Sequence, residues 1–91
     1  MRRKLNEKQL QFYNAIDKIL WNDWDPLGLN QYEDWPTDEY ENYVPTIFSL
    51  KIRGASVEAF AQRLYEIEIK QMGQNDGFEK CKQVAEKIFR L

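Results

Sequence analysis

Residues 21–28 read W-N-D-W-D-P-L-G and mark the point at which the first helix has to end. Proline disfavours a helical conformation in the residue before it, which here is Asp25. Aspartate in the first place, proline in the second and glycine in the fourth are typical of a type I turn. We therefore predict a turn over residues 25–28. The helix before it should have Trp21 as the last core residue of its apolar face.

The residues before this turn predict an amphipathic helix over about residues 6–22, because apolar residues recur at helical spacing and polar residues fall on the other side. Asn6 followed by Gln9 resembles a capping box, in which the side chain of Asn6 accepts a hydrogen bond from the first turn. The predicted apolar face consists of Leu10, Tyr13 or Phe12, Ile16, Ile19 and Leu20.

After the turn, residues 30–36 have no clear period and predict a loop. A loop of this length is tolerable in a small domain if its large side chains pack onto the fold. Here that condition falls on Tyr32 and Trp35, and the sequence leaves open whether Trp35 is exposed.

The start of the second helix has two alternatives, because Pro45 lies inside its apolar pattern. Proline is costly deep in a helix and well tolerated in the first turn. The helix either begins near Asp38, with Asp38 and Glu41 as an acidic cap and a bend at Pro45, or begins near Tyr43 after a short turn. Gly54 ends it in both cases.

Two more helices complete the chain. Ser56 is the expected cap of the third, Gly73 follows its end, and Asp76 with Glu79 repeats the capping-box spacing before the fourth. Strand alternation and internal repeats are absent. We predict an all-α, compact four-helix domain over residues 1–91, with a long aromatic and acidic loop between helices 1 and 2. The expected apolar faces are Val57, Phe60, Ala61, Leu64, Ile67 and Met72 on the third helix and Phe78, Cys81, Val84, Ala85, Ile88 and Phe89 on the fourth.

Four segments together resemble a family of small bacterial proteins, mostly from the Bacillus group, classed as domain of unknown function 1871. They are W-D-P-L-G at 24–28, D-E-Y-E-N-Y at 38–43, A-x-x-L-x-x-I at 61–67 and F-E-K-C-K-Q-V-A-E-K-I at 78–88. The resemblance covers nearly the whole chain, and its motifs are specific as a set rather than one by one. It implies a small, all-helical cytoplasmic protein with no established activity and no catalytic residue to transfer.

The charge distribution favours a basic or neutral partner and argues against nucleic acid. The net charge is −2, but residues 21–50 carry seven acids and no base. Nucleic-acid binding generally needs a basic face, and no concentrated one is visible. The acidic block would attract a basic partner or pair with the flanking helices.

The sequence contains no stretch with the length and apolar composition of a membrane-spanning helix. Polar residues 6–9 follow the basic residues 2–4, at the place where a secretory signal would need its apolar core. Cys81 is the only cysteine, which excludes an intramolecular disulfide. We predict a cytoplasmic protein that does not associate with membranes.

The sequence contains few side chains suited to catalysis. Histidine is absent, which removes the commonest near-neutral acid–base group and zinc ligand. Cys81 falls on the apolar face of the fourth helix and is predicted to be a buried structural thiol, so we expect no catalytic residue and no cofactor. The alternative is a divalent-metal-binding protein or a small hydrolase using Asp23, Asp25 and Asp34, although this stretch lacks the final glutamate of a calcium loop.

The aromatic residues carry most of the functional information. Seven of the thirteen fall within residues 21–48, together with the acidic block. Exposed Trp and Tyr side chains among carboxylates are typical of a protein-binding surface. We predict a non-enzymatic interaction or regulatory module that docks an unidentified, basic protein partner, with homodimerisation as a further alternative. The candidate partner-binding residues are Trp24, Glu33, Asp34, Trp35, Asp38, Glu39 and Tyr40.

Overall fold

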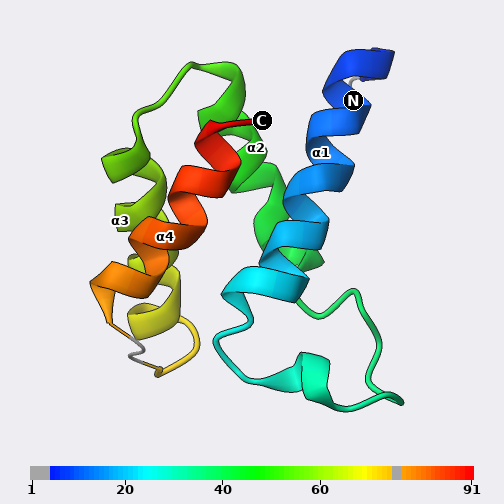
Figure 1. Cartoon of the computed structure of the whole chain (residues 1–91), viewed down its shortest axis with the longest axis vertical. Helices are drawn as coiled ribbons and strands as arrows, with labels where there is room; N and C mark the ends of the chain where they lie inside the picture. The colour runs from blue at the N-terminus through cyan, green and yellow to red at the C-terminus, as the bar shows by residue number, and fades with distance from the viewer. Residues whose placement is uncertain (1–4, 75–76) are drawn as a thin grey trace.

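The fold begins with helix α1 (Glu7–Ile19), seen in a computed structural model that describes residues 5–74 and 77–91 (Figure 1). The side chain of Asn6 accepts a hydrogen bond from the Gln9 amide at 2.8 Å, and the Gln9 side chain accepts one from the Asn6 amide at 3.1 Å. These two bonds confirm the predicted capping box. They fix the start of the helix, and Ile16 further along it is fully buried.

The first helix continues as a wider, π-helical turn over Leu20–Trp24, two residues further than predicted. The amide of Asp25 donates to the carbonyl of Leu20 at 2.9 Å, which spans five residues instead of the usual four. Trp24 lies four residues after Leu20 and eight after Ile16, so it falls on the same face of the helix. All three side chains are fully buried.

The predicted turn over residues 25–28 is confirmed by a hydrogen bond of 3.1 Å from the Gly28 amide to the Asp25 carbonyl. Asp25 has a left-handed backbone with φ of 31°, a conformation that aspartate tolerates better than most residues. The chain then forms a short 3-10 helix over Leu29–Gln31, so the predicted loop begins later than residue 30.

Helix α2 (Val44–Ile52) follows a 3-10 turn over Glu41–Tyr43, and Pro45 lies in its first turn. The later of the two predicted starts is therefore correct, and the start near Asp38 is wrong. Neither segment has a side-chain cap. The contact between Asp38 and Glu41 is a backbone hydrogen bond of 3.0 Å, so the predicted acidic cap does not form.

Helices α3 (Val57–Lys70) and α4 (Phe78–Phe89) run antiparallel as a hairpin (Figure 1). Gly54, with a left-handed φ of 74°, lies in the connection that follows α2. The hydroxyl of Ser56 accepts a hydrogen bond of 3.2 Å from the first turn of α3, which confirms the predicted cap. The predicted cap at Asp76 lies outside the described residues.

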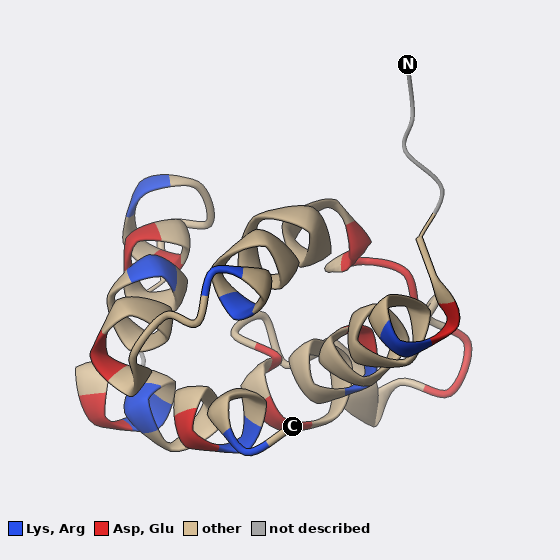
Figure 2. Ribbon diagram, turned by 90° about the horizontal axis from the view of Figure 1, so that it is seen from above, with Lys and Arg blue, Asp and Glu red and all other residues tan. Residues whose placement is uncertain are grey.

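One core holds the four helices together. Helix α2 contacts both α1 and α3, α4 contacts α1, and the helices surround a common centre when viewed from above (Figure 2). Phe78 and Phe89, which we predicted on the apolar face of α4, are exposed at the ends of that helix. The buried apolar residues are Ile16, Leu20, Trp24, Leu29, Tyr40, Val44, Ile47, Phe60, Ala61, Leu64, Ile67, Cys81, Val84, Ala85 and Ile88.

Candidate functional site

Residues 30–39 form one continuous exposed segment, which we call the acidic loop. The chain enters it after the buried Leu29 and leaves it at the buried Tyr40. The loop carries four carboxylates and no lysine or arginine. Figure 2 shows these acidic residues spread along the loop at the side of the helices. The fold thus presents this stretch of chain to solvent along its whole length.

Trp24 and Tyr40, which lie before and after the acidic loop in the sequence, pack against each other in the core. Their ring centroids are 5.5 Å apart, and the ring of Trp21 lies 5.8 Å from that of Tyr40. We predicted that Trp24 and Tyr40 contact a partner. That prediction is wrong, because both side chains are buried and have no surface to offer. Trp21, predicted to be a core residue, is only partly buried against this cluster.

The carboxylate of Asp25 ties the two ends of the loop together. Its Oδ1 accepts hydrogen bonds from the Tyr40 hydroxyl at 2.6 Å and from the Leu29 amide at 2.8 Å. Its Oδ2 accepts one from the Asn30 amide at 3.2 Å. The Tyr40 hydroxyl in turn accepts a bond from the Leu27 amide at 3.2 Å. Burial, followed by the hydrogen bond to Asp25, raises the pKa of Tyr40 above its usual value. Asp25 therefore has a structural role at this turn.

The alternative metal site at Asp23, Asp25 and Asp34 does not form. Asp23 makes an ion pair of 2.8 Å with Lys87 on α4, and Asp25 is engaged by the hydrogen bonds at the base of the loop. In the ranges 5–74 and 77–91, no three His, Cys, Asp or Glu side chains are grouped so that they could hold a metal ion. The predicted grouping of these three aspartates is therefore wrong.

A buried polar network, which the sequence analysis missed, links Trp24 to the α3–α4 hairpin. The indole N–H of Trp24 donates to Glu68 Oε1 at 2.8 Å, and the thiol of Cys81 donates to the same oxygen at 3.3 Å. Glu68 is fully buried. It lies four residues after Leu64, so its place on the apolar face of α3 was visible in the spacing. A charged residue on that face needs donors, and Trp24 supplies one.

Cys81 has the environment of a structural thiol, as predicted. It is fully buried. Burial and the hydrogen bond to Glu68 raise its pKa to about 12. Reactive cysteines are partly exposed and have a lowered pKa, because the thiolate is the nucleophile. The side chain of Cys81 therefore contributes to packing and to the network around Glu68.

The raised pKa of Cys81 predicts a loss of stability at alkaline pH. A thiol in the unfolded chain ionises around pH 9, whereas the folded thiol stays protonated to about pH 12. The stabilisation is thus fully present below pH 9 and is lost as the pH rises toward 12. Between pH 9 and 11 this group should lower the free energy of unfolding by up to about 2 kcal/mol.

Urea unfolding at a series of pH values measures this effect, with Cys81→Ala as the comparison. The variant should show a shallower decline than the wild type between pH 9 and 11. The raised pKa of Tyr40 adds a decline of the same sign in both proteins, at higher pH. Parallel curves for the two proteins would contradict the assignment of this slope to Cys81.

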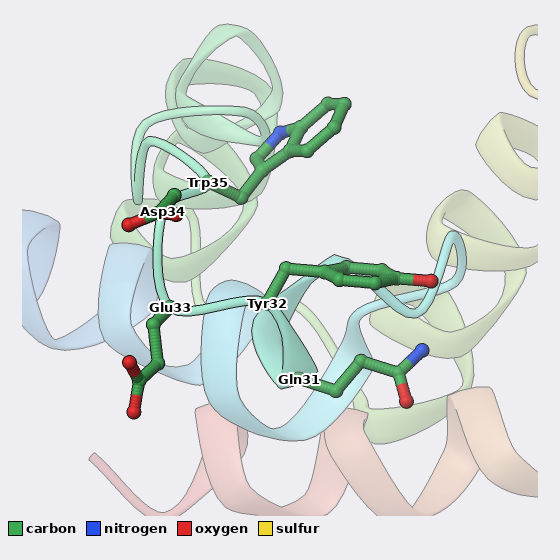
Figure 3. Close-up of a pocket in the computed structure, with 5 residues that line it drawn as sticks. All are labelled: Gln31, Tyr32, Glu33, Asp34 and Trp35. Atoms are coloured by element: carbon green, nitrogen blue, oxygen red, sulfur yellow. The ribbon is translucent and has the colours of Figure 1, made fainter.

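Tyr32 and Trp35 extend into solvent instead of packing onto the fold, so the condition that we set for a loop of this length is not met. Tyr32 is 56% exposed and Trp35 is 42% exposed. The amide of Trp35 donates to the carbonyl of Tyr32 at 3.2 Å, which makes residues 32–35 a β-turn. The side chains at its two ends, with Gln31, extend to one side, whereas those of Glu33 and Asp34 extend to the other (Figure 3). Residues 31–35 line a shallow pocket.

The remaining predicted residues, Asp38 and Glu39, are also exposed. Glu39 Oε2 accepts a hydrogen bond of 3.2 Å from the indole N–H of Trp35. Asp38 lies near Asp17 of α1, and its negative charge, after burial, contributes to a raised pKa of the Asp17 carboxyl. Of the seven predicted partner-binding residues, Glu33, Asp34, Trp35, Asp38 and Glu39 therefore share the acidic loop. Tyr32, which we had assigned only to packing, joins them.

In comparisons with protein-family models, curated proteins and solved structures, nothing matched the chain, so its resemblance to domain of unknown function 1871 stays a prediction. None of the helices in the part of the chain that the structure describes has the length and apolar composition needed to cross a bilayer.

Proposed function

We propose that this protein is a non-enzymatic interaction module that docks a basic protein partner through the acidic loop. The observation that carries the proposal is the exposure of Tyr32 and Trp35 at the two ends of one turn, within a segment rich in carboxylates. The other aromatic residues at the base of the loop, Trp24 and Tyr40, are buried in the core. Because the rings of Tyr32 and Trp35 are exposed, they contribute little to the fold and are free to contact another molecule.

Exposed rings of this kind suit protein recognition. Trp and Tyr are enriched among the residues that carry most of the binding energy at interfaces, because they bury a large area and lose little conformational freedom. Both side chains flank the turn, whose backbone hydrogen bond limits their movement relative to each other. A partner that covers them would remove apolar surface from water without requiring the helices to rearrange.

The charge of the loop favours a basic partner. Its four carboxylates have no lysine or arginine among them, and Asp38 adds to the negative field around Asp17. A cationic partner would relieve the repulsion between these two carboxylates. Two copies of the loop would repel each other, which disfavours a homodimer formed through it. We place the protein in the cytoplasm, where a lone reduced cysteine such as Cys81 is the usual state.

Charge reversal in the loop tests the proposal. The double variant Asp34→Lys and Asp38→Lys should abolish capture of the partner from an extract of the native cell, because a basic partner would then be repelled. The single variant Trp35→Ala should also weaken the capture, because it removes one of the two exposed rings.

The matched control reverses exposed acids outside the loop, with Glu58→Lys on α3 and Glu79→Lys on α4. The control should retain the captured protein at the wild-type level. This result would show that capture depends on where the charges are reversed and not on net charge alone. A partner that remains bound to the loop variant, or is lost equally from the control, would argue against the proposed surface.

A further inference from the structure

We propose that the pocket between Tyr32 and Trp35 takes up the guanidinium group of an arginine side chain from the partner. This inference rests on the proposed function, because it names the chemistry by which the acidic loop would recognise a basic segment. Three features of the pocket carry it: the spacing that the turn imposes on the rings, the position of Glu39, and the absence of a competing cation within the loop.

The turn sets a spacing that suits a flat group. The first and last Cα atoms of a β-turn lie less than about 7 Å apart. The upper limit of that distance is roughly twice the 3.5–4.0 Å separation of atoms in van der Waals contact. A planar group can therefore enter between two side chains that leave the ends of the turn on the same side, as Tyr32 and Trp35 do (Figure 3).

The electrostatics of the pocket select a positively charged group. The face of an aromatic ring attracts a cation, and the face of tryptophan does so most strongly. Glu39 accepts a hydrogen bond from the Trp35 indole, which places a carboxylate at the edge of one of the two rings and holds that ring in orientation. The side chains of Glu33 and Asp34 leave the turn on the other side from the two rings (Figure 3), and the negative charge of these two lining residues adds to the attraction for a cation.

Arginine fits these features better than lysine. Its guanidinium is flat, stacks on aromatic faces and forms paired hydrogen bonds to a carboxylate such as Glu39. The ammonium of lysine is a compact, strongly hydrated point charge that lacks a flat face. The lysines that lie near aromatic rings in this protein, Lys8 and Lys51, are on α1 and α2 against Phe12, so the pocket has no cation of its own chain among the contacts of the described residues.

A hexa-arginine peptide added to the 15N-labelled full chain in about 150 mM salt tests the inference, because this salt screens weak surface attraction. The indole N–H signal of Trp35 and the amide signal of Tyr32 should shift and saturate. The double variant Tyr32→Leu and Trp35→Leu should bind the peptide about 5- to 30-fold more weakly, which corresponds to two lost cation–π contacts at exposed sites. Hexa-lysine should bind the wild type more weakly than hexa-arginine.

The control replaces two exposed rings elsewhere, with Phe78→Leu and Phe89→Leu, and should bind hexa-arginine as the wild type does. Equal affinity of the wild type and the Tyr32/Trp35 variant would overturn the inference, as would equal affinity for the two peptides. If the ring variants weaken peptide binding but the charge-reversal variant still captures the native partner, the pocket stands and the proposed function fails.

Discussion

Replacing Trp24 with alanine is expected to lower the free energy of unfolding by about 3–5 kcal/mol. The side chain is fully buried, contacts the rings of Tyr40 and Tyr43, and donates its indole N–H to the buried Glu68. The substitution would leave a cavity and remove a donor from a buried carboxylate. Because small domains have a total stability of about 5–15 kcal/mol, a loss of this size removes a large part of the free energy that favours the folded state. Urea unfolding followed by circular dichroism measures the loss.

Trp35→Ala is the matched control, because it makes the same chemical change at an exposed tryptophan. Its expected effect on stability is within about 0.5 kcal/mol. Similar losses for the two variants would contradict the division of the tryptophans into one core and one surface residue. If Trp24→Ala does not fold, Trp24→Phe provides the measurement. It keeps an aromatic ring in the core and removes the N–H donor, at a cost of about 1–3 kcal/mol.

The sequence predicted the helices well where the signals are local. The caps at Asn6 and Ser56 depend on residues three positions apart, and both form as expected. The first helix extends two residues beyond its predicted end at residue 22, whereas the prediction that Asp25 is not helical is confirmed. In the structure, a π-helical turn carries the chain to Trp24, and Asp25 escapes the clash through a left-handed backbone.

The candidate site was predicted only in part, because exposure depends on contacts between distant segments. The composition of residues 23–41 indicated an acidic and aromatic surface, and the acidic loop carries that character. Composition alone did not separate the rings that pack from those that do not. Trp24 packs into the core, where Glu68, 44 residues away in the sequence, accepts its N–H. The indole N–H of Trp35 donates to the exposed Glu39, four residues away, and Trp35 stays at the surface.

Replacing Asp25 with alanine is expected to lower the free energy of unfolding by about 2–4 kcal/mol. The carboxylate accepts three hydrogen bonds at the base of the acidic loop, from the Leu29 and Asn30 amides and the Tyr40 hydroxyl. The Tyr40 side chain is buried, so its hydroxyl would lose a charged acceptor at a place that water reaches poorly. Alanine also tolerates the left-handed backbone at this position less well than aspartate. Urea unfolding of the variant gives the loss directly.

Asp25→Gly separates the backbone contribution from the contribution of the carboxylate. Glycine adopts the left-handed conformation without strain, so a loss that remains in this variant belongs to the missing hydrogen bonds. A double-mutant cycle with Tyr40→Phe isolates the Asp25–Tyr40 bond, and the coupling should be about 1.5–3 kcal/mol because the acceptor is charged. A coupling near zero would mean that the ring contacts alone hold Tyr40 in place. The same bond joins the two ends of the segment that presents Tyr32 and Trp35. Tyr40→Phe should therefore also speed proteolytic cleavage within residues 30–39, since the loop would then open at its base more often.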